Sequence, residues 1–208
     1  MRAAGVQVDR LHNGDHVALG RGAAVDVLWP RAPEPLTMNN SDLVLKLTYA
    51  RRTILFPSDI QAAAQAQLLK SPDRLHCDVM LATHHGSGEA TTASFIAAAD
   101  PLYIVSSNDN TLTQKQRLFE RQVGDRPLLR TNACGAVTIL IEQNGGLTVT
   151  PFVRADAATP QLRHLPLRAA RSARRDSIRS RCSRVSMVAA VMRLPIAQVA
   201  QTNRNTNT

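Results

Sequence analysis

Short apolar runs alternate with helical segments along residues 25–152, and this alternation limits the folds that the chain can adopt. Strands are expected within residues 25–29, 42–49, 53–56, 79–82, 102–105, 128–129, 136–141 and 147–152. Helices are expected over residues 61–69, 91–99 and 114–122. Strands with interleaved short helices predict a layered α/β domain with a mixed or antiparallel sheet.

Two hairpins are expected within this pattern. Asn144-Gly145-Gly146 favours a tight turn between the last two strands. A second turn is expected at residues 50–52, between the strands at 42–49 and 53–56, although it lacks the usual glycine.

Charge divides the chain into two parts. The 208 residues have a net charge of +9. Residues 1–156 carry 15 Lys/Arg and 15 Asp/Glu, whereas residues 157–208 carry ten Arg and one Asp. Residues 157–184 are rich in Arg, Ser and Ala and have no periodic apolar face. We therefore expect one domain over residues 1–154 and a disordered basic tail over residues 155–208.

The basic tail has two interpretations. Its arginines could form a nonspecific arm for nucleic acid, because guanidinium groups match phosphate oxygens. Residues 154–208 contain no aromatic side chain to stack on bases, which favours a solvated tail without a binding role. The dense part of the run comprises Arg168, Arg171, Arg174, Arg175, Arg179, Arg181 and Arg184.

Features of export and membrane insertion are not found in the sequence. No run of 18 uninterrupted apolar residues occurs, and the first residues lack the apolar core of a secretory signal. Cys77, Cys134 and Cys182 form no CxxC pair, so neither a disulfide framework nor a cysteine zinc site is indicated. A reduced, cytoplasmic protein without a transmembrane segment is expected.

Two of the predicted strands end at residues that can bind metals. Residues 55–59 (LFPSD) end at Asp59, and residues 81–87 (LATHHGS) lead to His84 and His85. Carboxylate oxygen and imidazole nitrogen are ligands that suit zinc. Each has a simpler interpretation, because Asp59 alone is more often a helix N-cap and a lone histidine is usually structural.

The combination resembles the metallo-β-lactamase domain of ComEC-type DNA-internalisation competence proteins. That family has an SLVL strand, a strand ending LLTGD, a strand ending PHHGS and a closing YRTD-x-x-GAV strand. Similar segments occur here at residues 40–45, 55–59, 83–87 and 130–137, and the resemblance covers about residues 8–152. It implies a partial αββα sandwich.

The resemblance also implies roles for individual residues. Asp59 matches the carboxylate that bridges two metal ions, here zinc, and the pair of His84 and His85 matches a further ligand. The sequence alone does not say which histidine binds, and we favour His85 as the ligand. His84 would contact the transition state. In such two-metal sites a bridging hydroxide attacks a phosphodiester, so DNA or another phosphodiester is the implied partner.

The sequence departs from the family at several positions, and these departures leave open whether the chain is an enzyme. The chain contains no HxHxDH motif, which supplies most of the family's ligands, so the first half of the sandwich is expected to be missing. Ser58 replaces the glycine of LTGD, and residues 110–114 replace an HPHP segment. The resemblance thus implies a hydrolase fragment with weak or no activity alone. The alternative is a non-catalytic interaction protein that contacts nucleic acid nonspecifically through its tail.

Overall fold

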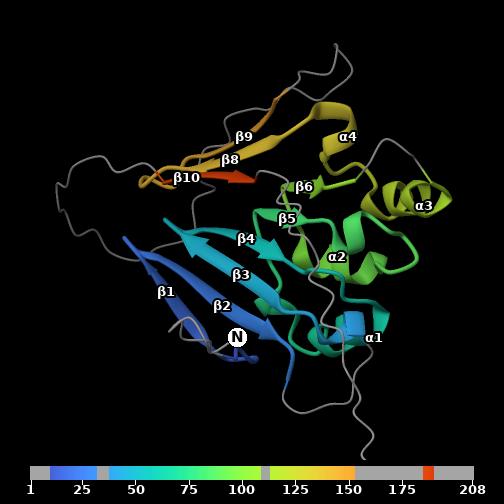
Figure 1. Cartoon of the computed structure of the whole chain (residues 1–208), viewed down its shortest axis with the longest axis horizontal. Coiled ribbons are helices and arrows are strands. Elements are labelled where there is room, and N and C mark those ends of the chain that lie inside the picture. Colours follow the sequence, from blue (N-terminus) through green and yellow to red (C-terminus); the bar gives the residue numbers. More distant parts are fainter. Residues whose placement is uncertain (1–9, 32–37, 109–112, 153–184, 190–208) are drawn as a thin grey trace, which may run out of the picture.

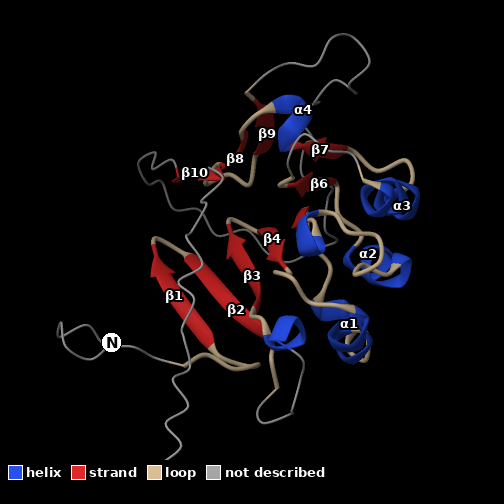
Figure 2. Ribbon diagram, turned by 45° about the vertical axis from the view of Figure 1, so that its right-hand side comes forward, coloured by secondary structure: helices blue, strands red, loops and turns tan. Residues whose placement is uncertain are grey.

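A computed structural model describes residues 10–31, 38–108 and 113–152 together with the strand at 185–189. A large sheet lies between a layer of helices on one side and a small sheet on the other (Figures 1 and 2). The large sheet consists of β1 (His16–Gly20), β2 (Ala23–Trp29), β3 (Val44–Tyr49), β4 (Arg52–Phe56), β5 (Val79–Leu81), β6 (Tyr103–Ser106) and β7 (Leu128–Arg130), paired in sequence order.

The small sheet has the strand order β10-β8-β9, with β8 (Val137–Ile141), β9 (Leu147–Pro151) and β10 (Val185–Ala189). The helices are α1 (Ala62–Leu68), α2 (Ala93–Ala99), α3 (Gln114–Val123) and α4 (Thr131–Cys134), and the short 3-10 helices are η1 (Met38–Ser41), η2 (Pro72–Arg74) and η3 (Thr83–His85). No helix in the described part of the chain is long and apolar enough to span a bilayer.

The large sheet is mixed, as the sequence predicts. Strands β1 to β4 pair antiparallel, and β4 to β7 pair parallel. The parallel strands are connected through α1, α2 and α3, because a parallel pair needs a crossover long enough to return the chain to the same end of the sheet. The predicted α/β class is confirmed.

Alternating side chains of the large sheet build two separate cores. Leu55 and Met80 pack with the helices, whereas their neighbours Ile54 and Val79 pack with the small sheet. Strands that are apolar on both faces therefore hold the three layers together. This explains why residues 53–56 and 79–82 are nearly continuous apolar runs.

Both predicted hairpins are confirmed. Strands β8 and β9 pair antiparallel across Asn144-Gly145-Gly146. Strands β3 and β4 also pair antiparallel, and their turn places Ala50 at φ 47° and Arg51 at φ 65°. Two consecutive positive φ angles are typical of a tight hairpin turn, which this chain forms without glycine.

Several elements differ from the prediction. Strand β1 and the short helix α4 were not expected from the pattern of apolar residues. Residues 185–189, within the predicted tail, form β10 on the edge of the small sheet, because they pair with β8. Residues 153–184 and 190–208 lie outside the described residues, so the predicted disorder of the tail stays a prediction.

Candidate functional site

The carboxyl ends of β4 and β5 bring the predicted site residues to one edge of the large sheet. Strand β4 ends at Phe56, three residues before Asp59, and β5 ends at Leu81, shortly before η3 with His84 and His85. Because the two strands are parallel neighbours, their following loops meet. The backbone N–H of His84 donates to the carbonyl of Ser58 at 3.1 Å, which joins the two loops.

Asp59 and His85 face each other across this junction. Their nearest polar atoms, His85 Nε2 and Asp59 Oδ1, are 3.9 Å apart, and the side chains are 64% and 40% exposed. His85 Nδ1 lies 2.9 Å from the carbonyl of Ser107. With the proton on Nδ1 this contact is a hydrogen bond, and the Nε2 lone pair is left toward Asp59. The pair is therefore accessible to a cation from solvent.

His84 occupies a strained position beside this pair. Its backbone lies at φ 47° and ψ 47°, and both His85 and Ser58 also have positive φ. Residues other than glycine rarely adopt these backbone angles, and such strain is concentrated at functional sites. His84 Nδ1 is buried without a hydrogen-bond partner among the described residues. The site therefore contains a buried polar atom whose hydrogen-bonding capacity is not used by the described residues.

Asp42 belongs to the same cluster and was not singled out from the sequence. Its Oδ2 accepts a hydrogen bond of 3.3 Å from the Asp59 N–H. Burial raises the pKa of the Asp42 carboxyl, and the Asp59 charge adds to this, while the Asp59 amide and His84 lower it. The predicted antiparallel hairpin was the signal that could have found it, since Leu45 pairs with Phe56. That register places the start of β3 beside the end of β4.

Asp59 is not a helix cap, so the simpler interpretation of this residue is wrong. The N-cap of α1 is Gln61, which makes no side-chain capping bond. The Oδ1 of Asn40 accepts instead from the N–H groups of Gln61 and Ala64, at 3.0 and 3.3 Å. A side chain from a distant segment thus satisfies the first turn of α1. The Asp59 carboxylate is left for other contacts.

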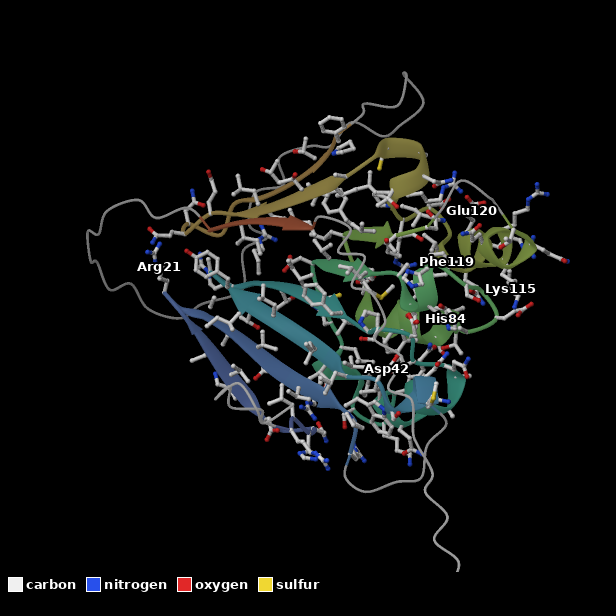
Figure 3. The ribbon with its side chains drawn as sticks, in the orientation of Figure 1. Arg21, Asp42, His84, Lys115, Phe119 and Glu120 are labelled. Carbon is white, nitrogen blue, oxygen red and sulfur yellow. The ribbon has the colours of Figure 1, made fainter. Side chains whose placement is uncertain are left out.

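A pocket of about 540 Å³ adjoins the cluster. Figure 3 shows Asp42, His84 and Lys115 at the same end of the molecule, coming from three different segments. Polar and charged side chains supply much of the pocket wall, including His84, His85, Ser87, Glu89, Thr113 and Lys115. The volume lies in the range of small-molecule sites, so a ligand has room beside the histidines.

The described residues provide few metal ligands in this cluster. No group of three or more His, Cys, Asp or Glu residues that could hold a metal ion occurs in residues 10–31, 38–108 and 113–152. Asp59 and His85 form a two-donor arrangement, and zinc in proteins takes three or four ligands. The arrangement can hold a cation weakly and can offer hydrogen bonds to a ligand.

Comparison with known proteins relates the chain to one competence-operon protein. No protein-family model matches the chain. Over 110 residues the chain is 28% identical to ComE operon protein 3 of Bacillus subtilis (strain 168). The match covers 52% of this chain and 14% of that protein. A sequence relationship to this protein is thus found, and it agrees with the resemblance expected from the motifs.

Proposed function

We propose that the chain is part of a metal-dependent hydrolase of the metallo-β-lactamase superfamily, similar to the ComEC competence proteins, whose substrate is a phosphodiester such as DNA. The meeting of Asp59 and His85 at 3.9 Å, on loops that follow adjacent parallel strands, carries the proposal. The match to ComE operon protein 3 supports it, as does the order of helix layer, mixed sheet and second sheet.

In this proposal Asp59 and His85 are metal ligands, and His84 contacts the reacting phosphate. Their donor types fit zinc, but two donors do not complete its coordination sphere. Bound metal ions would supply the activated water and the charge that stabilises the reacting oxygens. Because the described residues offer only part of such a site, we expect weak zinc binding and weak or no activity from the chain alone.

The alternative is a non-catalytic interaction protein. The lack of a three-donor group among the described residues favours it. DNA would then bind through the predicted basic tail, which lies outside the described residues. Both alternatives are compatible with the cytoplasmic location that we expect from the sequence. Cys77 and Cys134 are free thiols in the structure.

Zinc titration beside a phosphodiesterase assay tests the proposal. We expect well under one zinc ion per chain after dialysis, weak binding when zinc is added back, and negligible turnover of bis-nitrophenyl phosphate. Asp59→Ala and His85→Ala should each abolish the weak binding. His76→Ala is the matched control, because His76 is exposed and precedes β5 at its other end.

The outcomes separate the two functions. Zinc binding that survives both site substitutions would overturn the ligand assignment and favour the non-catalytic alternative. Stoichiometric zinc, with turnover that is lost in both variants, would show a working hydrolase and contradict the expected weakness of the site.

A further inference from the structure

Lys115 and Glu89 form an ion pair in the wall of the pocket beside the histidine pair. Lys115 Nζ lies 2.7 Å from Glu89 Oε2, and both side chains are more than half exposed. An exposed pair of this kind contributes roughly 0.2–1 kcal/mol. The lysine can therefore exchange its carboxylate partner for another anion at little cost.

The main chain fixes the position of Lys115 relative to His84 and His85. The Gly88 N–H donates to the carbonyl of Lys115 at 2.9 Å. The Nε2 of Gln122 donates to the carbonyls of Gly88 and Thr91, both at 2.9 Å. These bonds join the loop that carries the histidines to α3, so the backbone at Lys115 is held beside that loop.

Gly88 makes this close approach possible. A Cβ atom at this position would lie 2.4 Å from the backbone nitrogen of Phe119, which is too close for any other residue. Figure 3 shows Phe119 and Lys115 on the helix that faces His84. The contact brings the beginning of α3 against the site, although residues 88 and 115 are far apart in the sequence.

The two charges of this pair act on an anion in opposite directions. Among the described residues that line the pocket, Lys115 is the permanent cation and Glu89 the permanent anion, and the other polar side chains apart from the histidines are neutral. A phosphate group gains a charge-assisted hydrogen bond from Lys115 and is repelled by Glu89. The hydroxyl groups of Ser87 and Thr113 can donate further hydrogen bonds.

We propose that this pocket binds one phosphate group of a nucleotide chain, with Lys115 as its phosphate-binding residue and Glu89 as a competing anion that limits affinity. This inference rests on the proposed function and adds the residues that select the substrate. The pocket, with a volume of about 540 Å³, has room for a nucleotide unit beside His84. Glu89 releases Lys115 when the phosphate arrives.

Titration of the full chain with a 5′-phosphorylated thymidine dinucleotide tests this inference, with a chelator present so that no metal takes part. Lys115→Gln should weaken binding roughly three- to tenfold and reduce the slope of log affinity against log salt by about 0.7. Glu89→Gln should strengthen binding roughly twofold or more, because it removes the competing charge. Lys115→Arg should retain most of the affinity.

Arg117→Gln is the matched control, since Arg117 is an exposed cation on the same helix outside the pocket lining. NMR shifts of the Gly88 and Lys115 amides on titration with the dinucleotide should place it in the pocket. Inorganic phosphate should shift the same amides at higher concentration.

Opposite effects of Lys115→Gln and Glu89→Gln support the inference, because a purely structural ion pair would be lost equally in both variants. Equal affinities in these two variants, or shifts confined to residues outside the pocket, would overturn it. The measurement uses no metal, so it can succeed where the zinc test fails. If zinc-dependent turnover is found and neither variant changes KM, the inference fails while the proposed function stands.

Discussion

Strands β4 and β5 carry one ion-pairing set at their starts and another after their ends. At the starts, Arg52 Nη1 lies 2.8 Å from Asp78 Oδ1, with side chains that are 6% and 17% exposed. After the ends, His85 Nε2 lies 3.9 Å from Asp59 Oδ1, with side chains that are 64% and 40% exposed. The same two strands therefore hold a closed pair at one edge and an open pair at the other.

The closed pair is tied into the surrounding backbone. Arg52 Nε also donates to the carbonyl of Gly145 at 2.7 Å, and Asp78 Oδ2 accepts from the Thr53 N–H at 2.8 Å. These contacts join β4, β5 and the turn of the small sheet. Within the described residues the Asp59 side chain has no comparable set of bonds, and the backbone around the open pair is strained. A buried pair that is tied to the backbone stabilises the fold, whereas an exposed pair with fewer bonds remains able to bind.

The largest effect on the free energy of unfolding is expected from a substitution at the closed pair. Arg52→Ala leaves the Asp78 carboxylate without its cation in a largely buried position, so we expect a loss of about 3 kcal/mol in the free energy of unfolding. Arg126→Ala, at the more exposed pair with Asp100, should cost less than about 1 kcal/mol. Urea unfolding measures both variants. Equal losses would show that burial does not distinguish the two pairs.

A smaller effect is expected at Cys77, which lies beside the closed pair. Burial raises the pKa of its thiol from 9.0 to about 12, against a weaker influence of Lys46 that lowers it. The unfolded chain loses this proton near the ordinary value while the folded chain retains it, so stability falls as pH rises between these values. From about pH 9 to about pH 10 the loss attributable to Cys77 is roughly 1 kcal/mol.

Urea titrations at the two pH values, on the protein and on Cys77→Ala, measure this contribution. The substitution should remove that part of the pH dependence. If the free energy of unfolding of Cys77→Ala depends on pH as strongly as that of the protein, solvent reaches the thiol. This edge of the sheet would then be less closed than its ion pair indicates.

The smallest effect on stability is expected at the open pair. Asp59→Ala and His85→Ala should each change the free energy of unfolding by less than about 0.5 kcal/mol, because both side chains are exposed and their charges are 3.9 Å apart. The same urea titration measures this change. A loss as large as that of Arg52→Ala would make the pair structural and remove the basis of the comparison.

The sequence by itself determined the elements whose pattern is local. The apolar runs at residues 53–56 and 79–82 predicted β4 and β5, and Asn144-Gly145-Gly146 predicted the last hairpin. The sequence also placed Asp59, His84 and His85 after the ends of two strands, and the parallel pairing of these strands in the structure brings them to one edge. These features follow from periodicity and turn chemistry, which act over a few residues.

Other features were decided only by the tertiary structure, because they depend on how distant segments approach each other. Asp42 reaches Asp59 through the register of a hairpin, and Asn40 takes the capping role that was the simpler interpretation of Asp59. The ion pair of Glu89 and Lys115 exists because Gly88 allows α3 to approach the histidine loop. Strand β10 depends on a pairing with β8 from more than forty residues away in the sequence. Burial, register and close approach are properties of the packed layers, and no local pattern of residues specifies them.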